Sequence, residues 1–93
     1  MKVILIYDIS VETEGGQRRL TRVLKKARKY LHHVQKSVFE GELTAAQLRR
    51  LEVEILDEVD RHTDSVIIYT LPDAAKLGRK ILTEVEDPTA NIL

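Results

Sequence analysis

The chain has 93 residues, 43% of them apolar, with no cysteine and with 15 basic residues against 15 acidic ones. This size and composition favour one globular domain over residues 1–93 and exclude a disulfide framework or a thiolate zinc site. No apolar run approaches the ~20 residues that cross a bilayer, and the N-terminus lacks the pattern of a signal peptide. We therefore expect a cytoplasmic protein with no membrane partner.

The first predicted element is a strand over residues 2–9, rich in Val and Ile. Its continuous apolar run indicates that both of its faces are covered. Because side chains alternate across a strand, Val3, Leu5 and Tyr7 share one face. Asp8 lies on the opposite face.

Residues 10–17 form a loop punctuated by Gly15-Gly16, and a helix follows over 18–29. Apolar residues recur along this segment at helical spacing and predict its buried stripe: Leu20, Val23, Leu24, Ala27 and Leu31. The rest of its circumference is basic.

Two short antiparallel strands are predicted over 33–38 and 39–44. Thr44 and Gln47 match a capping box, so a second helix begins there and runs to about Val59. Its expected buried side consists of Leu48, Leu51, Ile55, Leu56 and Val59.

A last apolar strand spans 65–71 and is closed by Pro72. Residues 1–72 form the core of the domain, and 73–93 form a C-terminal extension with a short helix or strand over 77–85. The extension ends on the apolar stretch 90–93.

The element order β-α-β-β-α-β predicts an α+β, ferredoxin-like fold in which two helices cover one face of an antiparallel sheet. Two helices cannot cover both faces, yet strands 2–9 and 65–71 are apolar on both. The open face needs a partner, most simply a second copy of the chain around a two-fold axis. We therefore expect a homodimer, in which the C-terminal strand adds to the partner's sheet edge.

The charges are segregated along the chain. No acid stands between Gln17 and Phe39, where eight bases occur: Arg18, Arg19, Arg22, Lys25, Lys26, Arg28, Lys29 and Lys36. Solvated helices usually mix both signs in i,i+4 pairs, so this face predicts contact with a polyanion such as DNA or RNA. The alternative is an ordinary solvated face.

Asp8 has two interpretations. It either caps the end of the first strand, or lies at the dimer interface opposite a second Asp8. Two carboxylates ~4 Å apart repel by about 4 kcal/mol at an effective dielectric of 20, so such a pair holds a proton or a cation. Mg²⁺, or another divalent cation such as Mn²⁺, commonly takes one or two carboxylates and keeps its other waters.

Four segments together resemble the family of CRISPR-associated protein two, the small partner of the CRISPR integrase (protein one). They are Tyr7-Asp8-Ile9 at a strand end, the Arg-rich helix, Val34-Gln35-Lys36-Ser37-Val38-Phe39-Glu40-Gly41, and Asp64-Ser65-Val66-Ile67-Ile68-Tyr69. The resemblance covers nearly the whole chain and is thinnest over 72–93. It implies a prokaryotic homodimer that takes part in spacer acquisition.

The resemblance also implies roles for single residues. Asp8 is the family's interface aspartate, associated with Mg²⁺, and Tyr7 joins it as a candidate catalytic residue. Arg19, Arg22 and Phe39 match positions linked to activity or substrate contact. Many members carry arginine where this chain has His33.

Three activities follow as hypotheses. The dimer is a metal-dependent endonuclease on single-stranded RNA or double-stranded DNA, a non-catalytic scaffold that bridges DNA within the integrase complex, or a toxin-like nuclease of messenger RNA.

Overall fold

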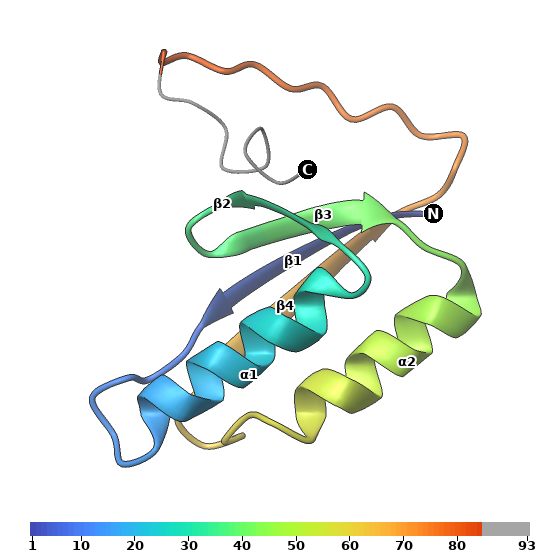
Figure 1. Cartoon of the computed structure of the whole chain (residues 1–93). Helices are drawn as coiled ribbons and strands as arrows, with labels where there is room; N and C mark the ends of the chain where they lie inside the picture. The colour runs from blue at the N-terminus through green and yellow to red at the C-terminus, as the bar shows by residue number, and fades with distance from the viewer. Residues whose placement is uncertain (85–93) are drawn as a thin grey trace.

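The structure is a computed structural model that describes residues 1–84. Its elements are β1 (Lys2–Asp8), α1 (Gly16–Arg28), β2 (His32–Gln35), β3 (Val38–Glu42), α2 (Ala45–Leu56) and β4 (Ser65–Leu71). The strands form one antiparallel sheet in the order β2-β3-β1-β4, and both helices lie on the same face of it (Figure 1). The predicted α+β, βαββαβ arrangement is confirmed.

Some predicted boundaries were wrong by a few residues. Helix α1 begins at Gly16 rather than at residue 18, because Gly15 ends the loop in a left-handed conformation with φ 77°. The two middle strands are shorter than 33–38 and 39–44, since residues 36–37 form the turn between them.

The capping box predicted at the start of α2 is confirmed. The Gln47 N–H donates to the Thr44 hydroxyl, and the Thr44 N–H donates to the Gln47 side chain, at 3.2 and 2.9 Å. The helix ends at Leu56 rather than near Val59. Leu56 was expected to be buried but is 47% exposed, because it stands ~100° round the helix from Ile55, at the margin of the apolar stripe.

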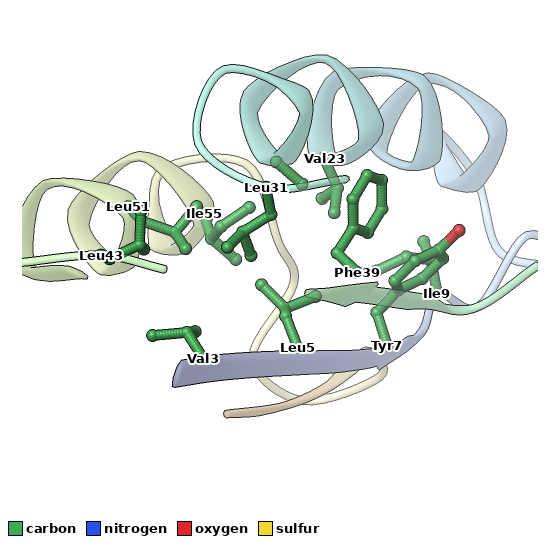
Figure 2. Close-up of a cluster of buried hydrophobic side chains, with 11 residues drawn as sticks. Val3, Leu5, Tyr7, Ile9, Val23, Leu31, Phe39, Leu43, Leu51 and Ile55 are labelled. Carbon is green, nitrogen blue, oxygen red and sulfur yellow. The ribbon is translucent and has the colours of Figure 1, made fainter. Parts of the chain in front are cut away.

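The core lies between the sheet and the two helices (Figure 2). Val3, Leu5 and Tyr7 project from β1 into it, as the alternation predicted, and Phe39 projects from β3. The helices contribute Val23, Leu51 and Ile55, and the connecting segments contribute Ile9, Leu31 and Leu43.

The opposite face of the sheet carries apolar side chains that no helix covers. Ile6 of β1 is 37% exposed, and Ile67 and Tyr69 of β4 are 47% and 53% exposed. The register pairs Ile6 with Ile67 across the two strands. This surface, Ile6, Ile67 and Tyr69, is called the open face below, and it was predicted from the two-sided apolar pattern.

The chain after β4 is extended. Residues 77–84 form neither the helix nor the strand predicted for 77–85, and residue 85 lies outside the described residues, as does the predicted apolar end at 90–93. Arg79 pairs with Glu40 of β3. Across residues 1–84, no helix has the length and apolar character needed to cross a membrane.

Candidate functional site

Asp8 is the last residue of β1, and its side chain is exposed on the same side of the sheet as the open face. It stands opposite Ser65, the first residue of β4. Within residues 1–84, no three His, Asp or Glu side chains gather closely enough to hold a metal ion. One protomer therefore offers a divalent cation a single carboxylate, a set that fits Mg²⁺ only when a second carboxylate or several waters complete it.

Tyr7 and Asp8 are not brought together. The Tyr7 side chain is buried under α1, on the face opposite Asp8 (Figure 2). Its hydroxyl donates to the Lys36 carbonyl at 2.5 Å, and the His33 ring nitrogen Nε2 lies 3.0 Å from the same carbonyl. Burial raises the pKa of Tyr7, although the nearby charge of Arg28 opposes this. The phenol thus stays protonated at neutral pH and holds the β2–β3 turn.

Phe39 lies inside the core and has no exposed surface. Its ring stacks on the His33 ring with centroids 4.4 Å apart, and the centroid of the Tyr7 ring lies 6.0 Å away. The predicted contact between Phe39 and nucleic acid therefore has no exposed ring to make it in this protomer.

Several bases on or directly after α1 are paired with acids on or directly after α2. Lys26 and Lys29 reach Glu54 at 3.5 and 2.7 Å, and Arg22 reaches Glu58 at 3.8 Å. The acids missing from the α1 sequence are thus supplied by α2 and the segment that follows it.

Glu54 joins the two helices. Tyr30 also donates its hydroxyl to this carboxylate. Hydrogen bonds from Lys29 and Tyr30 lower the pKa of Glu54 to about 2, so the carboxylate stays ionised and keeps the charges of Lys26 and Lys29 partly neutralised.

Four of the predicted nucleic-acid contacts are exposed and also unpaired within the described residues. Within residues 1–84 they form no ion pair with another side chain: Arg18, Lys25, Arg28 and Lys36. Arg18, Lys25 and Arg28 lie on α1, and Lys36 lies in the β2–β3 turn. We call these four residues the free bases.

Arg19 behaves differently from the free bases. Its Nε donates to Asp64 Oδ2 at 2.8 Å, and its side chain is only 17% exposed. The Asp64 side chain has no exposed surface. Burial opposes ionisation of Asp64, but hydrogen bonds from Arg19 and from the Asp60 and Ser10 N–H groups outweigh it and lower its pKa to about 2.

The sequence analysis missed Asp64 as a partner of Arg19. The two residues stand 45 positions apart, and no local spacing rule links them. The available signal was an aspartate immediately before an apolar strand, together with an arginine in the first turn of a helix.

Comparisons with known proteins give one consistent result. The sequence model of a family described as "CRISPR associated protein Cas2" matches residues 1–77. A protein of Moorella thermoacetica named "CRISPR-associated endoribonuclease Cas2 2" is 54% identical over 91 residues, which cover 98% of this chain and all of the relative. A Thermococcus kodakarensis protein named "CRISPR-associated endoribonuclease Cas2" is 40% identical over the full length of both chains.

The fold agrees with the sequence comparisons. The crystal structure of Streptococcus pyogenes Cas2 at pH 6.5 superposes with a TM-score of 0.71 and 34% identity. The superposition covers 84% of this chain and all of that one.

Proposed function

This chain belongs to the family described as CRISPR associated protein Cas2, and from that premise we propose that it is a homodimeric, divalent-metal-dependent endonuclease of CRISPR spacer acquisition. The observation that carries the proposal is the exposed Asp8 carboxylate at the end of β1, beside the uncovered apolar face. The names of the relatives make RNA the first substrate to test.

The open face supports the dimer. Ile6, Ile67 and Tyr69 form a contiguous apolar surface on two paired strands, and such surfaces on soluble proteins mark interaction sites. A two-fold axis through this surface brings the same patch of a second copy onto it.

The same two-fold axis brings together two Asp8 carboxylates, one from each protomer. Two Asp8 side chains facing one another repel unless a cation lies between them. Mg²⁺ or Mn²⁺ bound there supplies a more acidic water and neutralises charge on a phosphoryl oxygen. The chain's own contribution is to aim the two carboxylates and to hold the polynucleotide beside them.

The free bases hold the polynucleotide in this proposal. Arg18, Lys25 and Arg28 are exposed on α1, and Lys36 is exposed in the β2–β3 turn. Tyr7 supports that turn through Lys36 and does not touch the substrate.

The decisive experiment measures cleavage of labelled single-stranded RNA and duplex DNA with Mg²⁺ and with Mn²⁺. Asp8→Asn should lower the cleavage rate by about 100-fold or more, since losing ~3 kcal/mol of metal assistance has that effect. The variant should remain a dimer by sedimentation and bind nucleic acid as before. Undiminished cleavage by Asp8→Asn contradicts the proposal.

A second candidate function is a non-catalytic scaffold that bridges DNA for the CRISPR integrase. It is favoured by one observation, namely that the free bases are exposed independently of Asp8. Under it, replacing Arg18, Lys25 and Arg28 by Glu should abolish integration of a protospacer duplex by the reconstituted complex, whereas Asp8→Asn should leave integration intact. Loss of integration in Asp8→Asn rejects the purely architectural role.

A further inference from the structure

We propose that Arg19 is a positioning residue and not a nucleic-acid contact: together with Asp64 it fixes the β1–α1 loop to the start of β4 and thereby sets the direction of the Asp8 carboxylate. This pair is called the Arg19–Asp64 clamp below. The inference rests on the proposed function for its catalytic consequence, and its structural basis is independent of that function.

Every nitrogen of the Arg19 guanidinium donates within the protein. Nε donates to Asp64 at 2.8 Å, and Nη1 donates to the Glu14 carbonyl at 3.0 Å. Nη2 donates to the Thr13 hydroxyl at 2.8 Å and lies 3.3 Å from both the Ser10 carbonyl and Asp64 Oδ1. One side chain thus binds the loop at Ser10, Thr13 and Glu14 and binds the chain before β4 at Asp64.

The Asp64 carboxylate completes the clamp from the other side. It accepts the Ser10 N–H at 2.9 Å and the Asp60 N–H at 2.8 Å, in addition to the guanidinium. It therefore joins the β1–α1 loop, α1 and the α2–β4 loop in a single, partly buried network. A planar guanidinium suits this task, because its donors are fixed relative to one another.

The clamp acts on the backbone at both sides of Asp8. Ser10, which both clamp residues contact, follows Asp8 by two positions. Asp64 directly precedes Ser65, the residue paired with Asp8 across the sheet. Backbone packing holds the same loop, since a Cβ added at Gly16 would stand 2.3 Å from the Ser10 carbonyl oxygen.

A phosphate contact by Arg19 would conflict with this arrangement. Withdrawing the guanidinium would leave Asp64 buried and ionised without its cation, which is strongly destabilising. The free bases reach phosphates at no such cost. A metal site, in contrast, requires its ligands to be held within about 0.5 Å of the productive geometry, and the clamp provides that restraint at Asp8.

The test uses Arg19→Lys, which keeps the charge but loses the fork of donors, together with Asp64→Asn and the double variant. Arg49→Lys is the matched control for activity, because Arg49 is an exposed arginine of α2 outside the free bases, and Arg18→Lys, at the exposed neighbour of Arg19, is the control for hydrogen exchange. At a temperature at which all variants are folded, kcat for RNA cleavage should fall by about 10- to 100-fold in both single variants, as supporting residues of metal sites typically show. The double variant should be no slower than the slower single variant, because both changes break one interaction. KM should stay at the wild-type value in Arg19→Lys and Asp64→Asn, and Arg49→Lys should keep both the wild-type kcat and the wild-type KM.

The salt dependence of binding distinguishes the clamp from a phosphate contact by Arg19. In binding measurements over a range of salt, Arg18→Gln should reduce the salt dependence of the affinity, by about 0.9 in the log–log slope for each duplex DNA phosphate that the protein no longer neutralises. Arg19→Gln should leave that slope unchanged. A slope that changes equally in both variants overturns the inference, and so does an unchanged kcat in folded Arg19→Lys, which would reduce the clamp to a purely structural role.

The design separates failure of the clamp from failure of the proposed function. Wild-type protein that binds RNA and DNA but cleaves neither contradicts the nuclease, and amide hydrogen exchange then decides the clamp. Exchange over residues 10–14 should be at least about 10-fold faster in Arg19→Lys than in Arg18→Lys. Equal exchange in the two variants overturns the inference whether or not the protein is a nuclease.

Discussion

Replacing Asp64 with asparagine removes a buried negative charge and keeps the shape of the side chain. The pKa of Asp64 is about 2 in the folded chain against an ordinary value of 3.8. Because one pH unit of such a difference corresponds to 1.36 kcal/mol, ionised Asp64 stabilises the folded state by about 2 kcal/mol at neutral pH. The amide has one oxygen left to accept from the Ser10, Asp60 and Arg19 donors, so we expect a total loss of about 2–4 kcal/mol.

The loss depends on pH with a defined sign. Since the folded-state pKa lies below the unfolded one, the stabilisation is complete above about pH 5 and disappears as the pH falls from 3.8 through about 2. About half of the charge-dependent part should be gone at pH 3. The difference in stability between wild type and Asp64→Asn should shrink accordingly.

Urea unfolding at pH 7, 5 and 3, at one protein concentration, measures this difference. Asp57→Asn is the matched control, because Asp57 is an exposed aspartate at the end of α2 and its replacement should change stability by less than about 0.5 kcal/mol. In thermal unfolding, Asp64→Asn should lower Tm by roughly 10–20 °C at pH 7. A loss below 1 kcal/mol, or a loss that is the same at pH 7 and pH 3, refutes the reasoning.

Three further predictions concern other parts of the molecule. Phe39→Ala should cost about 3–5 kcal/mol by urea unfolding, because the ring is fully buried, and should leave the nucleic-acid affinity of the folded variant unchanged; a weaker affinity of the folded variant would restore Phe39 as a contact. Tyr7→Phe should cost about 1 kcal/mol through the lost bond to the Lys36 carbonyl while retaining cleavage; abolished cleavage in a stable variant would make the phenol catalytic. Ile67→Asp on the open face should yield monomers in sedimentation, whereas Leu56→Asp, equally exposed on α2, should not; a dimeric Ile67→Asp would place the interface elsewhere.

The parts of the fold that depend on local pattern could be predicted from sequence. Alternation along β1 placed Tyr7 inward and Asp8 outward, and the Thr44–Gln47 capping box located the start of α2. The apolar character of both faces of β1 and β4 indicated a surface that the helices leave uncovered. Each of these signals acts over a few residues.

The parts that depend on contacts between distant segments could not be predicted in this way. The bases of α1 looked uncompensated because Glu54 lies on α2 and Glu58 lies just after it. Arg19 looked like a free cation because its partner, Asp64, is 45 residues away. Phe39 and Tyr7 looked available to substrate because a motif carries no information on burial. Within residues 1–84, the free bases are therefore the predicted nucleic-acid contacts that are both exposed and without an ion pair.

The positions of the two Asp8 carboxylates relative to one another in the dimer test the central claim most directly. A crystal structure of the protein grown with Mn²⁺ shows these positions, and the anomalous signal of Mn²⁺ locates the metal. We predict one metal peak on the two-fold axis, with a carboxylate oxygen from each protomer bound to it directly or through a water. Two Asp8 carboxylates that face solvent on opposite sides of the dimer, with no metal between them, would contradict it.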